Sequence, residues 1–383
     1  MKKKIFIITI LIMISLNNYI LANENSSKHP KLWEQQWDMK EITKNGKSYK
    51  LSEGSHKTTV GIIDSGIKKD HPDLQMNIQG AKNFVPKGGI NGKEKYETGN
   101  INQIDDLTGH GTSVAGQIAA NGYMKGVAPK VGIKSYRAFS GKGISKTEWI
   151  CNAIKSAADD NVDVINISSG EYLINGPKKK DKHIDNQDQK DISMYKKAIS
   201  YAYSKGSIIV ASYGNDSINI DNSREFKEKY SKLNKTIKFN SSILDAPAQL
   251  DNVIGVASTN KKNSISHFTN YSDNIDIFAP GADDLLLSKY GKDFYANKMQ
   301  TKEQLLTTSV NGHYMYSYGN SLSTPKVSAT LALILEKYNY KGSPEKAIEH
   351  LKKYGYDNYK DKDSKKTINV LNTYRALNQN GGL

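Results

Sequence analysis

The chain is poor in cysteine and arginine and contains no long hydrophobic run. Cys151 is the only cysteine among 383 residues, which excludes an internal disulfide framework and a multi-cysteine zinc site. Only Arg137, Arg224 and Arg375 are arginines, whereas a dedicated nucleic-acid surface usually relies on arginine. The formal net charge of +15 comes from scattered lysines, so we interpret it as a solvated surface and expect no nucleic-acid partner. A mean hydropathy of −0.62 excludes a polytopic membrane protein.

The N-terminus has the pattern of a targeting signal. Three lysines at positions 2–4 precede an uncharged run, Ile5 to Leu16, and a small residue follows at Ala22. This pattern predicts a signal peptide over residues 1–22, because the run is shorter than the roughly 20 residues that span a membrane. An uncleaved N-terminal anchor is the alternative. We expect a secreted, extracellular protein that either diffuses freely or stays at the cell surface, which agrees with the single cysteine.

Strand and helix patterns alternate along the rest of the chain. Short β-branched runs predict strands at residues 58–63, 131–139, 162–167, 207–211 and 252–257. Apolar residues at spacings of three and four predict helices at 146–159, 191–203 and 322–337. This alternation indicates an α/β fold with a parallel sheet that is covered on both faces. Two polar segments, residues 176–190 and 217–242, are expected to be surface loops.

Three short motifs lie where such a fold could carry chemistry. Asp64 ends the first predicted strand, although a strand-end cap explains it equally well when it is taken alone. His110 stands among small residues at a helix start, as either a general base or a cap. Ser321 opens an apolar helix, near N–H groups without helical partners, as either a nucleophile or an N-cap. Pro325 is tolerable there if it lies in the first turn of that helix.

Taken together, the three motifs form a catalytic set. A serine nucleophile needs a base, and the base needs a carboxylate to orient it. The motif around Asp64 continues into His71-Pro72-Asp73-Leu74, and the others read Gly109-His110-Gly111-Thr112 and Gly319-Asn320-Ser321-Leu322-Ser323-Thr324-Pro325. Their order, Asp then His then Ser, is that of subtilisin. From about residue 37 to 338 the chain resembles the subtilases, the subtilisin-like serine proteases. The resemblance implies a three-layer fold with a central, mostly parallel sheet, and a catalytic triad of Asp64, His110 and Ser321 that forms an acyl-enzyme.

The resemblance also implies residues that bind the substrate. Asn215, in the segment Ala211-Ser212-Tyr213-Gly214-Asn215, corresponds to the family's oxyanion-hole asparagine. The segments Gly141-Lys142-Gly143 and Ser168-Ser169-Gly170 correspond to the two walls of the cleft, between which the peptide lies as an added antiparallel strand.

Several features depart from the family pattern. Asn320 replaces the usual threonine beside the nucleophile, and Ser328 replaces a small apolar residue or cysteine on the following helix. The loop at 119–129 is shorter than in subtilisin, so we expect the calcium site that would include Asp73 to be lost. Another structural calcium site remains open, and the chemistry requires no cofactor. No prodomain is recognisable: a short segment, residues 23–36, precedes a peptidase domain that we place at 37–383.

Within the subtilases, the chain resembles the lantibiotic leader peptidases of low-GC Gram-positive bacteria. The similarity lies in Gln36-Trp37-Asp38-Met39-Lys40, in Pro325-Lys326-Val327-Ser328 and in the Lys-, Asn-, Ile- and Tyr-rich composition. It implies a narrow substrate range and a single cleavage in a lantibiotic precursor, and we expect the enzyme to be a monomer. One alternative is a general secreted protease that degrades extracellular proteins. A second is an inactive subtilase fold that serves as a binding protein, although the intact set of Asp64, His110, Asn215 and Ser321 argues against it.

Overall fold

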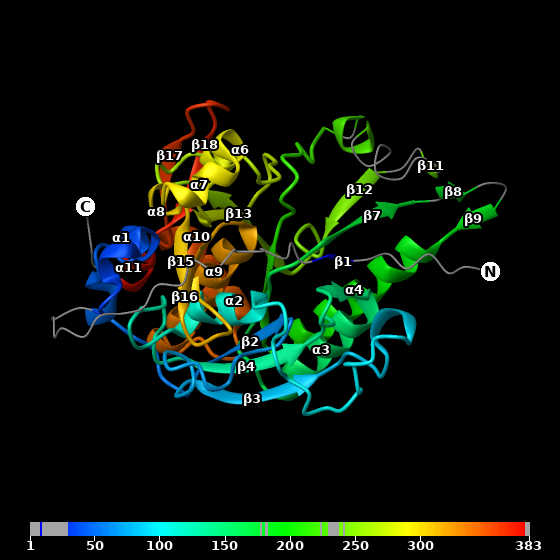
Figure 1. Ribbon diagram of the computed structural model, residues 1–383, viewed down its shortest axis with the longest axis horizontal. Coiled ribbons are helices and arrows are strands. Elements are labelled where there is room, and N and C mark those ends of the chain that lie inside the picture. The colour runs from blue at the N-terminus through cyan, green and yellow to red at the C-terminus, as the bar shows by residue number, and fades with distance from the viewer. Residues whose placement is uncertain are drawn as a thin grey trace.

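A nine-stranded sheet forms the centre of the molecule (Figure 1). The computed structural model describes residues 8–9, 30–176, 178–180, 183–222, 224–228, 237–239 and 242–379. The strand order is β17-β18-β14-β13-β10-β6-β2-β4-β3, and every neighbouring pair is parallel except β17 and β18. The strands are β2 (Thr59–Asp64), β3 (Ile78–Asn83), β4 (Gly132–Arg137), β6 (Val164–Ile167), β10 (Ile208–Ser212), β13 (Val253–Thr259), β14 (Ile277–Pro280), β17 (Tyr356–Lys360) and β18 (Thr367–Leu371).

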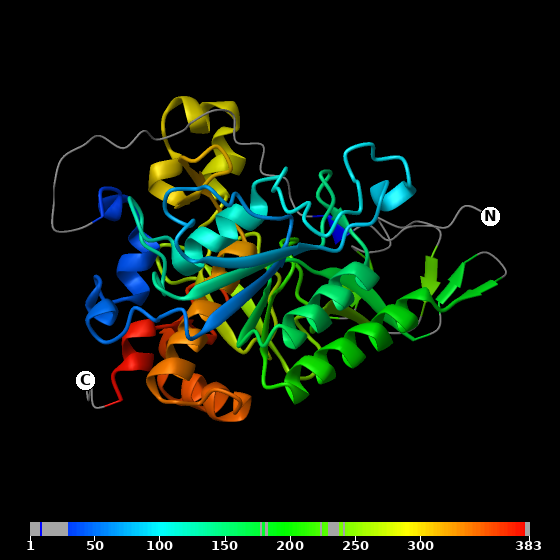
Figure 2. The same ribbon diagram turned by 90° about the horizontal axis from the view of Figure 1, so that it is seen from below.

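Helices cover both faces of this sheet, as the sequence predicts. Successive side chains of a strand point to opposite faces, and β2 shows this directly. Ile63 belongs to the core cluster that contains Trp149, whereas Ile62 belongs to the cluster that contains Val114 and Leu331. One face is therefore covered by α3 and α4, which lie side by side (Figure 2), and the other by α2 and α9. These helices are α2 (His110–Ala119), α3 (Thr147–Asp159), α4 (Gln187–Ser204) and α9 (Asn320–Lys337).

The predicted strands and helices all appear within a few residues of their expected positions. Strands β3, β14, β17 and β18 have no counterpart among the predictions. β3 is only half buried and its sequence, IQGAKN, mixes polar and small residues, so it carries no hydrophobic pattern. β14 is four residues long and ends in a proline. Short or half-exposed strands of this kind depend on their neighbours in the sheet more than on their own sequence.

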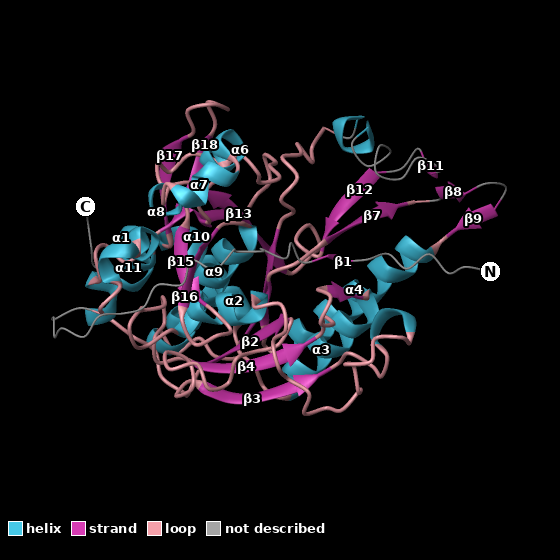
Figure 3. Ribbon diagram, viewed as in Figure 1, coloured by secondary structure: helices cyan, strands magenta, loops and turns pink. Residues whose placement is uncertain are grey.

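The expectation of surface loops at 176–190 and 217–242 is wrong in part. β7 (Glu171–Asn175) and β12 (Ser242–Ala246) form an antiparallel pair that projects from the body, and a small sheet of β11, β8 and β9 lies beyond it (Figure 3). Its strands are β8 (Lys178–Lys180), β9 (His183–Asp185) and β11 (Ile237–Phe239), and residues 224–228 are helical. The high charge of these segments therefore does not prevent their backbone from pairing as strands.

The N-terminal segment packs on the body of the protein. Leu32 and Trp33 are buried, and the Leu32 N–H donates to the carbonyl of Tyr123, so packing begins before residue 37. α1 (Trp37–Ile42) follows, after η1 (Trp33–Gln35) and before η2 (Lys47–Lys50). Of the predicted signal peptide, only β1 (Ile8–Thr9) is among the described residues, and the proposed cleavage site lies outside them.

The remaining elements surround α9 and its strands. α10 (Pro344–Tyr354) and α11 (Thr373–Leu377) pack against α9. The hairpin of β15 (Leu305–Thr308) and β16 (Tyr314–Ser317) lies beside α2. Between β14 and β15 the chain forms α6 (Leu285–Tyr290), α7 (Lys292–Ala296) and α8 (Gln300–Glu303), and the other short elements are β5 (Ile144–Ser145) and η3 (Gly89–Asn91). None of the described helices is long and apolar enough to cross a membrane.

Candidate active site

The sheet order brings the predicted site residues to one edge. β4, β2, β6 and β10 are consecutive neighbours, and they are parallel. Asp64 is the last residue of β2, and Asn215 follows β10. The predicted cleft walls, residues 141–143 and 168–170, follow β4 and β6. Because the carboxyl ends of parallel strands meet at the same edge of a sheet, these groups lie together there, where such folds bind ligands.

Asp64 and His110 are directly hydrogen-bonded. His110 is the first residue of α2, and its Nδ1 lies 2.8 and 3.0 Å from the two carboxylate oxygens of Asp64. Gly111 permits this approach, because a Cβ there would collide with the carbonyl oxygen of Gly66. Burial lowers the pKa of His110, but the negative charge of Asp64, its hydrogen bond and the charge of Asp106 outweigh burial and raise the pKa above its ordinary value. The bond also leaves Nε2 as the nitrogen that can accept a proton.

Asp106 joins the histidine motif to the aspartate motif, and the sequence analysis missed it. Its Oδ1 accepts a bond of 2.8 Å from the Ser65 hydroxyl group and one of 2.8 Å from the Gly109 N–H. Its Oδ2 accepts bonds from the N–H and the hydroxyl group of Thr112, at 2.8 and 2.7 Å. The sequence does contain a signal for this role, because Asp106 lies shortly before the start of α2. Carboxylates in such places accept hydrogen bonds from the N–H groups that have no helical partner.

Ser321 is the second residue of α9, where N–H groups have no helical partner. Pro325 lies beyond the first turn, because α9 begins at Asn320 and Pro325 is its sixth residue. Proline has no N–H, so the carbonyl of Ser321 loses its usual helical donor. The hydroxyl group of Ser168 replaces that donor at 2.8 Å. Ser168, predicted as a cleft residue, thus holds the backbone of the predicted nucleophile.

Asn320 links α9 to the segment that contains Asn215. The Asn320 N–H donates to Oδ1 of Asn215 at 3.0 Å, which leaves the Asn215 amide NH2 group free to point elsewhere as a donor. The Asn320 side chain donates to the Gly214 carbonyl at 2.8 Å and accepts from the Thr269 hydroxyl group at 2.8 Å. Asparagine in place of the family's threonine is therefore fully hydrogen-bonded. The other departure, Ser328, donates to Asn166.

One predicted cleft wall is held by a buried ion pair. Gly143 has a φ of +68°, which glycine adopts without strain, and Lys142 at the tip of the turn is exposed. The Gly141 N–H donates to Glu97 at 2.7 Å, and Glu97 also receives two bonds, of 2.7 and 2.8 Å, from buried Arg137. β5 follows this wall and pairs antiparallel with β1, so its edge can accept an added strand.

A carboxylate lies behind the other wall. Asp245 of β12 is fully buried, and its Oδ1 would lie 3.4 Å from a Cβ placed on Gly170. Its Oδ2 accepts bonds of 2.8 Å from the Gly214 N–H and from Asn270. Burial raises the pKa of Asp245 to about 7. Ser169, the middle residue of this wall, is also buried.

Asp73 would be part of the calcium site that we expect to be lost. Its carboxylate oxygens accept hydrogen bonds from groups of the protein itself. Its Oδ1 accepts bonds from the Tyr123 N–H at 3.0 Å and the Tyr314 hydroxyl group at 2.8 Å, and its Oδ2 accepts one from the Met124 N–H at 2.9 Å. Calcium needs six to eight oxygen ligands, and N–H donors cannot serve as such. These surroundings do not fit the ion. Among the described residues, no group of three or more His, Cys, Asp or Glu side chains could hold a metal.

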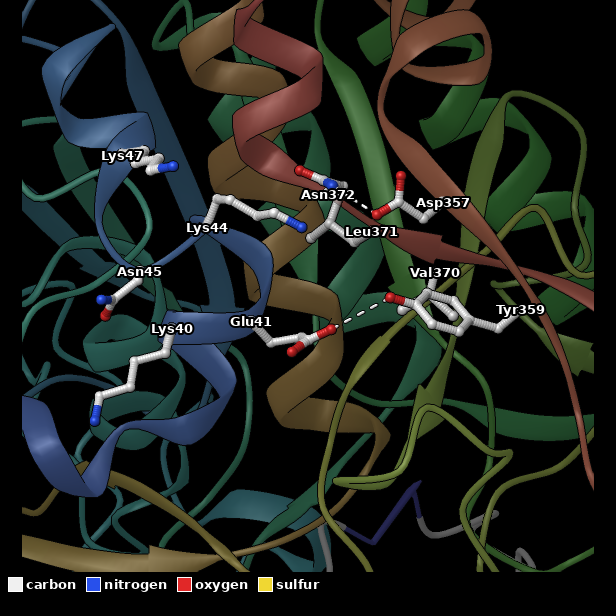
Figure 4. Close-up of a pocket in the computed structure, with 10 residues that line it drawn as sticks. All are labelled: Lys40, Glu41, Lys44, Asn45, Lys47, Asp357, Tyr359, Val370, Leu371 and Asn372. Atoms are coloured by element: carbon white, nitrogen blue, oxygen red, sulfur yellow. Dashed lines mark hydrogen bonds between the residues drawn. The ribbon is translucent and has the colours of Figure 1, made fainter. Parts of the chain in front are cut away.

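A pocket of about 380 Å³ lies away from this site, between α1 and the β17–β18 hairpin (Figure 4). It is lined by Lys40, Glu41, Lys44, Asn45, Lys47, Asp357, Tyr359, Val370, Leu371 and Asn372. None of the predicted catalytic or cleft residues is among them. The pocket therefore belongs to the contact between the N-terminal segment and the C-terminal hairpin.

The comparison with known families agrees with this site. The model of the subtilase family matches residues 55–368, and the chain belongs to that family. It is a serine protease, and its α/β fold is the subtilisin-like one predicted from the sequence.

Its relatives include two enzymes named for leader processing. The chain is 44% identical to the epidermin leader peptide-processing serine protease of Staphylococcus epidermidis, over 94% of this chain and 77% of the relative. It is 41% identical to the nisin leader peptide-processing serine protease of Lactococcus lactis, over 96% of this chain but only about half (52%) of that relative. The crystal structure of the nisin leader peptidase from Lactococcus lactis is similar with a TM-score of 0.84 and 42% identity, over 92% of this chain and 96% of that one.

Proposed function

We propose that this serine protease is exported and removes the leader peptide from a lantibiotic precursor. The hydrogen bond between His110 Nδ1 and Asp64 at the sheet edge is the observation that carries the catalytic assignment. The leader substrate is supported by the two relatives named for leader processing, which align with nearly the whole chain. Export is supported by the signal-peptide pattern of residues 1–22. A peptide entering as an extended strand between residues 141–143 and 168–170 is the only partner that the reaction requires.

The mechanism is acyl transfer. His110, oriented by Asp64, takes the proton of the Ser321 hydroxyl group through Nε2 as Ser321 attacks the scissile carbonyl. The oxyanion accepts hydrogen bonds from the Asn215 NH2 group and from the N–H of Ser321 at the start of α9. His110 then gives the proton to the leaving amine, which leaves an acyl-enzyme. Water, activated by His110, releases the acid, and Asp64 stabilises the charged imidazolium in both steps.

The test is mass spectrometry of two substrates treated with the purified protein. A leader-bearing lantibiotic precursor and unfolded casein are each incubated with the enzyme, and the Ser321→Ala variant is run beside it. One cut at the leader junction and few in casein support the proposal. Many cuts in casein would identify a general secreted protease instead, and binding without any cut would identify an inactive fold. Cleavage that persists in Ser321→Ala would overturn the mechanism itself.

A further inference from the structure

A lysine and an aspartate form an ion pair inside the protein, between the N-terminal helix and the helix that carries Ser321. The Nζ atom of Lys326 on α9 lies 3.0 Å from Oδ2 of Asp38 on α1, and both side chains are 0% exposed. Among the described residues, neither oxygen of Asp38 accepts a further hydrogen bond. A buried charge that loses its one partner is strongly unfavourable, so each of these two groups depends on the other.

Lys326 reaches back to the residue next to the nucleophile. Its Nζ donates a bond of 2.8 Å to the carbonyl oxygen of Leu322. The preceding carbonyl, that of Ser321, receives the hydroxyl group of Ser168. Two successive carbonyls in the first turn of α9 are thus held by side chains. The N–H of the same turn is the proposed donor to the oxyanion, so a small shift of this turn moves both the nucleophile and its donor.

α1 contacts this turn at a second point and is itself fixed. Trp37 packs against the small cluster of Leu322, Leu305 and Ala282, and its Nε1–H donates to the Gln304 carbonyl at 3.0 Å. The Gln36 side chain exchanges two bonds, of 2.8 and 2.9 Å, with the backbone of Lys125. Asp38 is therefore presented to Lys326 by a helix that is anchored on both sides.

The other side of α1 carries a carboxylate that is exposed to solvent, that of Glu41. Figure 4 shows Glu41 reaching toward Tyr359 of β17, on the side of the helix that borders the pocket. Glu41 is exposed, whereas Asp38, on the same helix, is completely buried. The two carboxylates thus provide a matched pair, with the same helix and the same charge but only one ion pair to α9.

We propose that Asp38 is a positioning residue for Ser321: by compensating Lys326, it holds the first turn of α9 in the geometry that peptide hydrolysis requires. Asp38 then supports the catalytic geometry from the N-terminal helix, although it touches no substrate. This inference rests on the proposed role of Ser321, and the experiment below separates the failure of one from the failure of the other.

Few other ionisable groups face the pair. Tyr49 of η2 is near Asp38, and burial together with the charges of Asp38 and Glu53 raises its pKa far above the ordinary value. Glu53 itself is paired with Lys125 and Lys130. Burial lowers the pKa of Lys326, and Asp38 opposes that effect. Removing the charge of Asp38 therefore lowers the pKa of Lys326 further, because burial then acts without that opposition.

The experiment compares four full-length proteins, wild type, Asp38→Asn, Asp38→Asn/Lys326→Met and the control Glu41→Gln, on fluorescently labelled unfolded casein and on a leader-bearing precursor. A fluorophosphonate titrant counts the reactive serines, so that kcat refers to competent molecules. At pH 7 we expect Asp38→Asn to lose about 10–100-fold in kcat with little change in KM, as for a displaced catalytic group. Its kcat should recover as the pH rises and Lys326 becomes neutral. The double variant should have a higher kcat than Asp38→Asn at pH 7 and show no alkaline recovery, and Glu41→Gln should match wild type.

Three results would overturn the inference: wild-type kcat in Asp38→Asn, the same alkaline recovery in the double variant as in Asp38→Asn, or a double variant no better than Asp38→Asn. If Asp38→Asn does not fold, Asp38→Glu decides, because it keeps the charge and displaces the carboxylate. A lowered kcat at unchanged KM supports positioning in that variant, and a wild-type kcat refutes it. Failure of the proposed function itself is seen separately, as activity that survives Ser321→Ala.

Discussion

Ser328 on α9 donates a hydrogen bond of 2.8 Å to the side-chain oxygen of Asn166 on β6. Asn166 in turn donates to the Ser168 hydroxyl group at 2.9 Å, and Ser168 donates to the carbonyl of Ser321. The chain of bonds leaves α9 in its middle and returns to its first turn through the sheet. It replaces the bond that Pro325 cannot make and so fixes the backbone of Ser321.

Breaking this chain should lower activity more when the broken bond lies nearer to Ser321. Ser168→Ala leaves the buried Ser321 carbonyl without a donor and should cost about 1–3 kcal/mol of stability, with a clear fall in kcat. Ser328→Ala should cost about 1 kcal/mol and reduce kcat less, since Asn166 and Ser168 remain. Urea unfolding and kcat measurements check both, with exposed Ser200→Ala as the control. Equal effects of Ser168→Ala and Ser200→Ala on kcat would contradict this account.

Asp64→Asn should reduce kcat by about 10⁴-fold, because the histidine tautomer is no longer fixed. The pH profile gives a second readout. Catalysis needs neutral His110, so kcat/KM rises as the pH increases through the histidine pKa, which Asp64 holds above 6.5. Without the Asp64 charge, burial is left to lower the pKa, and the acid limb should move to lower pH. Exposed Asp70→Asn is the control, and an acid limb that stays in place in Asp64→Asn would refute the assignment.

Lys142→Glu should lower kcat/KM on leaders that carry acidic residues. Its side chain is exposed at the tip of the turn that forms one cleft wall, where it can meet a carboxylate of the bound peptide. Precursor variants with neutral and acidic leaders measure the effect, and Lys292→Glu, an exposed lysine on α7, serves as the control. An unchanged kcat/KM on acidic leaders would remove Lys142 from substrate recognition.

Glu171→Gln should make the protein more stable near neutral pH. Glu171 is buried at the start of β7, where its Oε1 accepts bonds from Thr147 and Tyr195, and burial raises its pKa to about 7. The folded state therefore holds this proton more tightly than the unfolded state. The stabilisation is complete below about pH 4.5 and is lost as the pH rises through 7, a change of about 3 kcal/mol.

The glutamine variant keeps both hydrogen bonds and does not ionise, so its advantage over the wild type should grow across that interval. Urea unfolding at pH 4.5 and pH 8 measures it, in a Ser321→Ala background that prevents self-digestion. Exposed Glu148→Gln should show no such trend. A difference between Glu171→Gln and its parent that does not depend on pH would contradict the assignment.

A chelator should leave the thermal midpoint of the Ser321→Ala protein unchanged within about 1 °C, since a saturating bound ion would contribute several degrees. Asp73→Asn, in contrast, should lose about 1–3 kcal/mol, because its donors bind a charged oxygen. Differential scanning fluorimetry with and without added calcium checks both statements. A midpoint that falls with the chelator and returns with calcium would reveal a calcium site.

The sequence predicted the parts of the site that are local. Asp64, His110 and Ser321 each stand in a short motif beside a strand or a helix, so their surroundings can be recognised from a few neighbours. Lys326 could not be assigned in this way. A lysine in an apolar helix is usually a surface residue, and its partner Asp38 comes from the other end of the chain. The same holds for Ser328 and Glu97. Each acts through a contact with a side chain that is distant in the sequence and that only the fold brings near, Asn166 for Ser328 and Arg137 for Glu97.

The hydrogen bonds around Asp73 have a consequence for where the enzyme can work. Each donor to this carboxylate belongs to the polypeptide, so the equilibrium that keeps the loop after α2 in place is unimolecular. Dilution cannot remove a partner that is covalently attached, and no competing solute can titrate it away. We therefore expect this anchor to hold equally well in a medium rich in divalent ions and in one that has been stripped of them.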